Sequence, residues 1–425
     1  MAVLLLDIAT ARKLKREVSM RLVITCNGPG ETSGWLRPFL RALYDRQADA
    51  DVHVFYVPDD YATGQEPAVV RQLFPQATVY DAKTYVKMAF GARIDGAPEG
   101  ADAVLYLGGD LTHTQRLHKR FGGALLTYKF SRPRYARVTA RAFAVDESNA
   151  RQLMLWGVAH ERIERVGNLA IDGALIEAAM PPEEGAPHGG ILIMPGSRNY
   201  EVRHLVPFFF TAAIRMRRAS ALPIAFGISP FTRLEAVREA VESGGDPRVF
   251  AQRGTLIEND GHAFLCTPDR SACFPIVRSA ISAARVARLV VTIPGTKVIE
   301  LAAIGKPVIA CTPLNAPELA AINGPLTYLD RIPLVGVPAK RAVVTAYSRR
   351  HRYHTQPNID AGSQIVQELH GTLTPGRVAR ISLERVGDSI WLERTSQALR
   401  NLYREHAGAA ARMADGILAL QACAG

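Results

Sequence analysis

The stretch RLVITCNGPGETSGW, residues 21–35, sets the fold class, because an apolar run typical of a buried strand passes directly into a glycine-rich turn. Gly28 and Gly30 match the opening of the dinucleotide-binding pattern G-x-G-x-x-G, but Ser33 stands where that pattern needs its third glycine. The next apolar run, residues 51–57, ends without the acidic residue that holds a nicotinamide ribose. The turn therefore predicts a strand-to-helix junction without a nicotinamide cofactor.

The same alternation of apolar runs and helix-like segments continues along the chain. The predicted strands lie at residues 21–26, 51–57, 101–109, 124–129 and 141–146 in the first half, and at 190–196, 222–228, 287–295 and 305–312 in the second. Strands that alternate with helices are typical of a parallel sheet covered by helices on both faces. The sequence therefore predicts an α/β protein with two Rossmann-like parallel-sheet domains and C-terminal helices.

Changes in composition mark the predicted domain boundaries. A Pro/Gly-rich polar stretch separates the two series of strands, and the pattern becomes purely helical near the C-terminus. The predicted parts are an N-terminal extension (1–20, with the natural start at Met1 or Met20), a first Rossmann-like domain (21–175), a linker (176–188), a second Rossmann-like domain (189–377) and helices that pack back on the first domain (378–425). Two such domains are expected to hold a ligand in a central cleft, at the carboxyl ends of their strands.

Bulk composition limits the class of partner only loosely. The 425 residues carry a formal net charge of +11, which suits an anionic partner, although a generally basic proteome explains it equally well. The five cysteines are scattered and do not form a metal-binding pattern, so we expect reduced, buried thiols in a cytoplasmic protein with no metal site. No apolar run reaches the ~18–20 residues of a membrane span.

Three strand-to-helix junctions are candidate ligand sites, and the first is the opening turn. Gly30 lets the backbone approach a ligand closely because it has no Cβ. Glu31 places a carboxylate at the predicted cleft, and Ser33 is expected to cap the helix that follows. A plain glycine-rich connection is the alternative interpretation.

The second junction lies in ILIMPGSRNYEVRHLVPFFF, residues 191–210. Gly196 and Ser197 stand where a helix begins, and free backbone N–H groups at a helix N-terminus attract an anion. Arg198 adds a planar guanidinium that matches phosphate oxygens. The alternative is structural, because Glu201 has the spacing of a capping-box partner for this turn.

The third junction lies in LVVTIPGTKVIELAAIGKPVIACTPLNAPE, residues 289–318. Gly295 and Thr296 offer backbone and hydroxyl donors to a diphosphate. Glu300, one turn into the predicted helix, has two acceptor oxygens for the two hydroxyls of a ribose. A buried structural glutamate is the alternative for this position.

The motifs of the second half carry a family resemblance. MPGSRNYEVRHLVP (194–207), PGTKVIELAAIGKPVI (294–309) and QPNIDAGSQIVQELHG (356–371) resemble, in order and separation, the lipid-A-disaccharide synthase family. The opening turn is similar to that family's first motif. The resemblance implies an inverting glycosyltransferase of the two-domain GT-B type, with a UDP-sugar on the second domain, the acceptor on the first, and neither metal nor cofactor.

The resemblance also implies roles for individual residues. Those implied to bind substrate are Gly30, Ser33, Gly196, Ser197, Arg198, Gly295, Thr296, Glu300, Pro357, Asn358 and Glu368. Asp110, which ends the run VLYLGGD, is implied as the base that deprotonates the acceptor, and Glu31 is the alternative. The departing UDP is expected to be stabilised by helix N–H groups and Arg198.

The expected reaction transfers acylated glucosamine from UDP to a phosphorylated acylated glucosamine, a glycolipid acceptor of lipid A synthesis. The segment KTYVKMAFGARI, residues 83–94, is the candidate for a peripheral contact with the inner membrane, and a homodimer is a further possible partner state. The basic stretch 339–358 is read as a loop near the diphosphate and not as a nucleic-acid site, because no nucleic-acid-binding motif accompanies it. Another UDP-sugar transferase, a UDP-sugar 2-epimerase and a non-catalytic nucleotide-sugar-binding protein are the alternatives.

Overall fold

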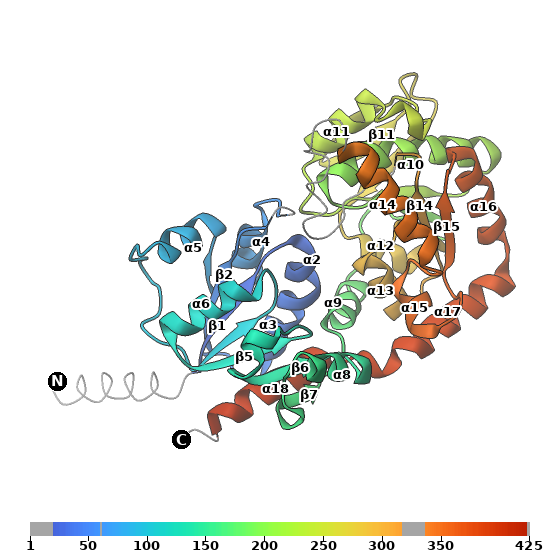
Figure 1. Ribbon diagram of the computed structural model, residues 1–425. Helices are drawn as coiled ribbons and strands as arrows, with labels where there is room; N and C mark the ends of the chain where they lie inside the picture. The colour runs from blue at the N-terminus through green and yellow to red at the C-terminus, as the bar shows by residue number, and fades with distance from the viewer. Residues whose placement is uncertain (1–19, 60–61, 317–335, 423–425) are drawn as a thin grey trace. The chain divides into compact units, whose positions relative to one another are not determined.

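The computed structural model describes residues 20–59, 62–316 and 336–422, and it divides into two compact units (Figure 1). The first unit comprises the described residues up to Gly173 together with those from Glu405 onward, and the second runs from Ala174 to Arg404. The predicted N-terminal extension lies outside the described residues, apart from Met20.

Parallel strands build the sheet of the first unit. Within the described residues its order is β3-β2-β1-β4-β5-β6-β7, and every neighbouring pair is parallel. The strands are β1 (Arg21–Cys26), β2 (Asp51–Tyr56), β3 (Thr78–Tyr80), β4 (Ala103–Tyr106), β5 (Ala124–Tyr128), β6 (Thr139–Ala144) and β7 (Ile163–Arg165). The helices are α2 (Pro29–Glu31), the π-helix η1 (Thr32–Leu36), α3 (Arg37–Arg46), α4 (Glu66–Leu73), α5 (Ala82–Ala89), α6 (Leu111–Phe121), α7 (Pro133–Ala136), α8 (Glu147–Leu155), η2 (His160–Arg162) and α18 (Ala409–Ala422), with α9 (Leu169–Ala178) leading into the second unit.

The second unit repeats the parallel core of this plan and adds two antiparallel strands at one edge of its sheet. Within the described residues its sheet has the order β10-β11-β12-β9-β8-β13-β14-β15, in which only the pairs β10–β11 and β11–β12 are antiparallel. The strands are β8 (Ile191–Met194), β9 (Ile224–Gly227), β10 (Thr255–Asn259), β11 (His262–Cys266), β12 (Cys273–Val277), β13 (Leu289–Thr292), β14 (Val308–Pro313) and β15 (Gln367–Gly371). The helices are α10 (Asn199–Ala219), α11 (Leu234–Ser243), η3 (Pro247–Val249), α12 (Ala280–Val286), α13 (Thr296–Ala303), α14 (Gly336–Arg350), α15 (Gln356–Ala361), α16 (Pro375–Gly387) and α17 (Ser389–Tyr403), with η6 (Arg404–His406) leading back into the first unit.

Both sheets contain the strand order of the dinucleotide-binding fold, which confirms the predicted fold class. In the first unit the order reverses at β1 and β4, and in the second at β8 and β13. Ligands of open α/β sheets bind beyond the carboxyl ends of the strands at such a switch point. The turns after β1, β4, β8 and β13 are therefore the places where each unit is built to hold a ligand.

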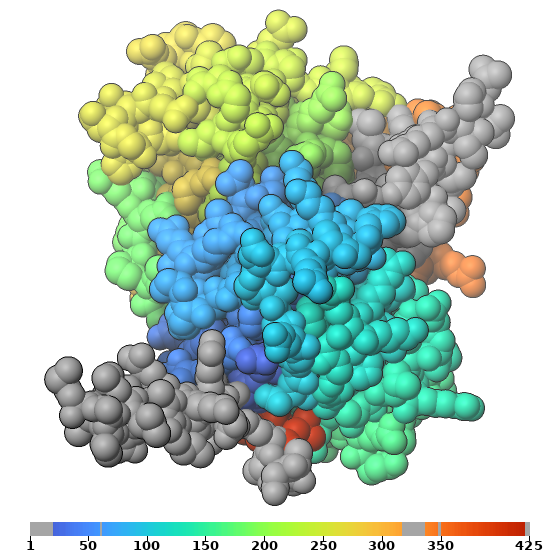
Figure 2. All heavy atoms as spheres, turned by 90° about the vertical axis from the view of Figure 1, so that its left-hand side faces the viewer, coloured from blue at the N-terminus to red at the C-terminus, as the bar shows by residue number. Residues whose placement is uncertain are grey.

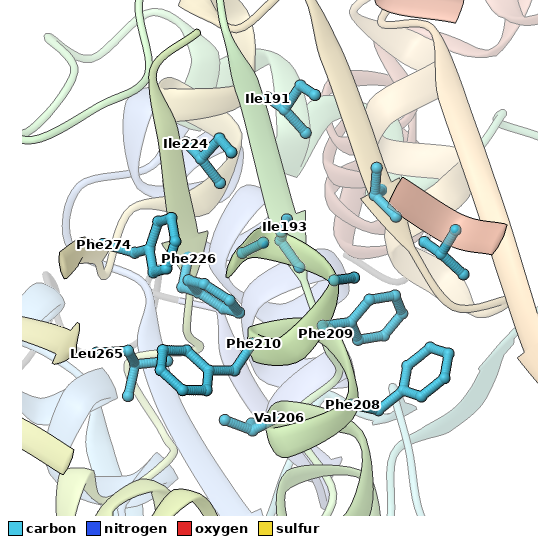
Figure 3. Close-up of a cluster of buried hydrophobic side chains, with 14 of the residues drawn as sticks. Ile191, Ile193, Val206, Phe208, Phe209, Phe210, Ile224, Phe226, Leu265 and Phe274 are labelled. Carbon is cyan, nitrogen blue, oxygen red and sulfur yellow. The ribbon is translucent and has the colours of Figure 1, made fainter. Parts of the chain in front are cut away.

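A large aromatic cluster fixes the core of the second unit. Phe208, Phe209 and Phe210 follow one another on α10, and all three are fully buried. They are buried together because α10 packs against the sheet and also against α11 and α16. Figure 3 shows the ring of Phe210 beside Phe226 of β9, with Phe208 and Phe209 on the other side of α10.

The added hairpin corrects the expectation for the cysteines. Cys266 on β11 and Cys273 on β12 face each other directly across the antiparallel pair and form a disulfide. The expectation of reduced thiols is therefore wrong for this pair. The hairpin of β11 and β12, which was not predicted, brings the two cysteines together although they are seven positions apart in sequence. Cys26 and Cys311 are buried thiols, and Cys423 lies outside the described residues.

The segments between and after the two sheets also differ from expectation. The segment 176–188, predicted as a linker, belongs to the second unit, where the carboxylate of Glu183 accepts hydrogen bonds from the backbone of Arg278 and Ser279, each at 2.6 Å. Helix α18 belongs to the first unit and packs on α3, but α16 and α17 belong to the second unit. The prediction that all of residues 378–425 pack on the first domain is therefore wrong for α16 and α17, whose buried faces cover α10, α13 and α15.

Candidate functional site

The switch point of the first unit contains a cavity of about 340 Å³. Its lining comes from the turns after β1, β2 and β4, and consists of Asn27, Pro58, Asp59, Gly109 and Asp110. The predicted base Asp110 therefore lies where the topology places a ligand. Asp59 was not predicted as a site residue, although it belongs to the same wall.

Asp110 has two structural partners at this edge. It is the N-cap of α6, where its Oδ1 accepts a hydrogen bond from the backbone N–H of Thr112 at 2.8 Å. Its Oδ2 accepts a hydrogen bond from Nη2 of Arg132 at 2.8 Å. Burial acts to raise the pKa of Asp110, but the bonds from Thr112 and the charges of Arg132 and His113 outweigh it and lower that pKa below its usual value. Asp110 is therefore an ionised carboxylate at neutral pH, held in one orientation.

Glu31 and Asp59 approach the same point of this turn. A Cβ added to Gly28 would lie 3.0 Å from Oδ2 of Asp59 and 3.1 Å from Oε2 of Glu31. Asp59 also accepts a hydrogen bond from Nδ2 of Asn27 at 3.1 Å. Gly108 has a φ of +150°, and a Cβ there would lie only 2.3 Å from Oδ1 of Asn27, so glycine is required for this close approach. The two carboxylates and the amide thus form one group at the end of β1.

The predicted role of Ser33 as a helix cap is wrong. The helix begins four residues earlier, at Pro29 with Gly28 as its N-cap, so Ser33 lies inside the helical run. Its hydroxyl donates to the carbonyl oxygen of Pro29 at 2.9 Å. Gly30 is exposed in the first turn, with no described atom within 4 Å of the place where its side chain would begin. Gly30 therefore leaves the backbone open on the side away from the core.

At the switch point of the second unit, the start of α10 is closed by the protein's own carboxylate. Oε2 of Glu201 accepts hydrogen bonds from the backbone N–H groups of Ser197 at 2.8 Å and Arg198 at 3.0 Å. Gly196 makes this possible, because at its φ of +108° a Cβ would lie 2.3 Å from the same oxygen. The expectation that these two N–H groups bind phosphate is therefore wrong, since Glu201 acts as the capping-box partner. The guanidinium of Arg198, whose side chain is 41% exposed, is the group this turn offers to a ligand.

Helix α13 begins beside this turn and is open. The hydroxyl of Thr292 donates to the carbonyl oxygen of Met194 at 2.8 Å, which ties the carboxyl ends of β13 and β8 together. Gly295 is the N-cap of α13 and supplies no side-chain cap, and both Gly295 and Thr296 are exposed. No described atom lies within 4 Å of the place where a Gly295 side chain would begin. An uncapped N-terminus at a switch point provides N–H groups and a positive helix dipole for an anion.

Glu300 is a buried residue of α13, one turn after the helix N-terminus. Its side chain is only 4% exposed, and its Oε2 accepts a hydrogen bond from Nζ of Lys297 at 2.6 Å. The carboxylate therefore holds Lys297 in the first turn of α13 beside the open N-terminus. A ribose contact of Glu300 stays a prediction, and the observed contact is this ion pair.

Asn358 is a structural residue of the third motif. It is fully buried, and its Nδ2 donates to the carbonyl oxygen of Val366 at 2.9 Å and to Glu368 at 2.7 Å. Its Oδ1 accepts from the backbone N–H groups of Ile365 at 2.7 Å and Val366 at 2.8 Å. These four bonds use both donors and both acceptor positions of the amide, so its predicted direct contact with substrate is wrong.

Glu368 and Pro357 complete the same internal network. Oε1 of Glu368 accepts from the backbone and the hydroxyl of Thr355 at 2.9 and 2.6 Å, and Oε2 accepts from the backbone of His354 at 2.9 Å. Pro357 is buried in the first turn of α15. Glu368 of β15 is thus hydrogen-bonded to Asn358 of α15 and to the residues just before that helix. These internal bonds account for the polar side chains of the motif.

The basic stretch 339–358 is mainly helical. Most of the basic stretch 339–358, predicted as a loop, lies in helix α14, because residues 336–350 contain no helix-breaking residue beyond the first turn.

In segment 83–94, Phe90 at the end of α5 is 88% exposed, and Lys87 and Arg93, close to it in sequence, are exposed as well. Figure 2 turns this blue-to-cyan side of the first unit toward the viewer.

In the part of the chain that is described, no helix is long and apolar enough to cross a membrane, and no three His, Cys, Asp or Glu side chains are placed to hold a metal ion.

No protein-family model and no curated protein matches this chain, whereas solved structures do. The chain is similar to S. aureus MnaA in its complex with UDP, with a TM-score of 0.57 and 13% identity over 93% of this chain and 95% of that one. A putative UDP-N-acetylglucosamine 2-epimerase from Listeria monocytogenes gives a TM-score of 0.56 and 14% identity over 93% and 95%. The glycotransferase of kitacinnamycin gives a TM-score of 0.50 and 14% identity over 95% and 99%. The fold is GT-B. At these identities the likeness establishes the fold alone.

Proposed function

We propose that this protein is a UDP-sugar-dependent glycosyltransferase whose second unit binds the donor diphosphate at the start of α13. The observation that carries the proposal is the contrast between two neighbouring helix starts. Helix α10 is closed by Glu201, whereas α13 begins with the exposed pair Gly295–Thr296 and no side-chain cap. Arg198 and Lys297 place cationic side chains on the same edge of the sheet. A diphosphate satisfies both the open N-terminus and the cations.

The first unit supplies the acid–base chemistry in this proposal. In an inverting transfer, a carboxylate removes the proton from an acceptor hydroxyl while the oxygen attacks the anomeric carbon and the bond to UDP breaks. Asp110 is ionised and oriented by Thr112 and Arg132, and Glu31 is the second candidate base. The charge that develops on UDP is stabilised by the N–H groups of α13 and by Arg198. A lipid A-type acceptor rests only on the motif resemblance.

A UDP-sugar 2-epimerase is the second candidate. The observation that favours it is the grouping of Glu31, Asp59 and Asp110 at one switch point, because removal and return of a proton on a sugar ring needs more than one acid–base group. One of the three similar structures described above is a putative UDP-N-acetylglucosamine 2-epimerase. This candidate needs no acceptor, which makes the two reactions easy to separate.

Incubation of the purified chain with UDP-N-acetylglucosamine, followed by anion-exchange chromatography and ³¹P NMR, tests the proposal. The transferase predicts UDP release that depends on an added acceptor sugar. The epimerase predicts a new UDP-sugar without any acceptor, and a binding protein predicts neither product. Arg198→Ala should weaken UDP binding about tenfold or more, since charge-assisted hydrogen bonds contribute ~1.5–3 kcal/mol. The matched control is Arg151→Ala, at an exposed site on α8 of the first unit.

A further inference from the structure

The lining of the first unit's cavity is acidic, and none of its five described residues is basic. Its five residues include two aspartates, Asp59 and Asp110, and the amide of Asn27. Arg132 lies outside this lining set and is hydrogen-bonded to Asp110 at 2.8 Å. In a protein of net charge +11 this is a local reversal of sign. A phosphate group in the cavity would meet like charge on two sides, which disfavours its binding.

The hydrogen-bonding groups of this wall are mostly acceptors. Oδ1 of Asn27 is buried and has no hydrogen-bond partner among the described residues, while its Nδ2 donates to Asp59. The carboxylates of Asp59 and Asp110 add further acceptor oxygens. A ligand that satisfies this wall must bring donors, such as the hydroxyls of a neutral sugar or the ammonium of an amino sugar.

The helix start at this cavity does not offset the negative charge. Helix α6 begins here, and a helix N-terminus normally attracts an anion. Its first turn is already capped by Asp110, whose Oδ1 accepts from the backbone N–H of Thr112. The field of Glu31 and Asp110 also reaches Tyr106, whose pKa is raised by burial and further by these two carboxylates. The cavity therefore has the polarity opposite to that of the open start of α13.

From this contrast we infer that the acceptor site of the first unit takes a neutral or cationic polyhydroxylated molecule, such as an amino sugar, and rejects phosphorylated sugars. The inference rests on the proposed function and departs from the phosphorylated acceptor that the motif resemblance implies. Anionic recognition is assigned to the second unit alone. We assign this specificity to Asp59, because Asp59 lines the cavity and the proposed transfer does not use it as the base.

Saturation-transfer NMR on the full chain with saturating UDP tests the inference, because UDP occupies the phosphate-binding site of the second unit. The probes are glucosamine, N-acetylglucosamine and N-acetylglucosamine 1-phosphate. We expect the first two to bind and the phosphate to bind at least tenfold more weakly. Asp59→Asn, which keeps the shape and the acceptor for Asn27, should narrow that difference at least threefold. Asp95→Asn, at an exposed position of the same unit, should leave it unchanged.

Equal or tighter binding of the phosphate overturns the inference, and so does the absence of binding by all three sugars. A preference that persists unchanged in Asp59→Asn assigns it to another residue and overturns the role of Asp59. Failure of UDP itself to bind contradicts the proposed function instead. Thermal melting of each variant separates these results from misfolding.

Discussion

Oε2 of Glu201 lies 2.8 Å from the backbone nitrogen of Ser197, so the glycine-rich turn after β8 binds a carboxylate of its own chain. Gly196 permits this contact because any side chain there would collide with Glu201. At the turn after β13, no described residue lies within 4 Å of the place where a Gly295 side chain would begin, and Gly295 supplies no side-chain cap. One turn of the second switch point is therefore structural, and its neighbour is open to a ligand.

Removal of this cap should cost stability without removing the open site. Glu201→Ala leaves the N–H groups of Ser197 and Arg198 without their acceptor, so we expect the free energy of unfolding to fall by about 1–2 kcal/mol. Glu201→Gln keeps one acceptor oxygen and should lose less than half as much. Urea denaturation measures both values. Equal losses for Ala and Gln would show that the acceptor oxygen is not what matters.

The pH dependence of turnover identifies the base. If Asp110 is the base, the acid limb of kcat/KM lies below the usual range of an aspartate, because Thr112 and Arg132 lower its pKa. Arg132→Met removes one of these causes and should move the limb upward by about one pH unit. Asp110→Asn should abolish turnover and preserve UDP binding. A limb that stays in place in Arg132→Met, with turnover lost in Glu31→Gln, assigns the base to Glu31.

Lys306 should make stability rise at alkaline pH. Burial lowers its pKa to about 8, assisted by the charge of Arg400, whereas an unfolded lysine titrates near ~10.4. Between these values the unfolded chain binds more protons, so this residue's unfavourable contribution is complete below pH ~8 and is relieved as the pH rises. Between pH 8 and 10, the free energy of unfolding of the wild type should therefore rise by about 1–2 kcal/mol more than that of Lys306→Met. Parallel pH curves for the two proteins in urea denaturation would contradict this assignment.

The exposed end of α5 predicts contact with anionic lipid. Phe90 is 88% exposed between the exposed cations Lys87 and Arg93, a combination suited to the interface of an acidic bilayer. Phe90→Ser should weaken co-sedimentation with phosphatidylglycerol vesicles at least threefold, and added salt should weaken it further. The control is Ile390→Ser, because Ile390 is 75% exposed but lies near the acidic Asp388 and Glu393. Equal loss in both variants, or no binding by the wild type, removes this contact.

The apolar runs of the sequence predicted the sheets well because parallel strands are buried on both faces. The run at residues 21–26 coincides with β1, and those at 124–129 and 305–312 overlap β5 and β14. Buried parallel strands read as continuous apolar segments, and the glycine turns that follow them mark the carboxyl edge. The antiparallel strands β10 and β11 were missed because they are partly exposed, whereas the equally short strands β8 and β13 are fully buried.

The site was harder to predict, because a polar residue in a motif can face either a ligand or its own chain. Asn358 and Glu368 have the composition of a binding motif, but each satisfies the other and the neighbouring backbone. Asp59 carries no motif, and only the pairing of β1 with β2 brings it to Asn27. Its position just past a strand end was the available signal. Ser33 was misassigned because the helix starts at Pro29, before the first serine or threonine.

Crystals of the chain soaked with UDP test the central claim most directly. We predict density for the diphosphate against the backbone N–H groups at Gly295 and Thr296, with the guanidinium of Arg198 turned toward it and Glu201 still bound to Ser197. Thr296→Pro, which removes one of these N–H groups at a helix position that tolerates proline, should weaken UDP binding in calorimetry. A diphosphate that binds away from the start of α13, or no binding at millimolar UDP, would contradict the account.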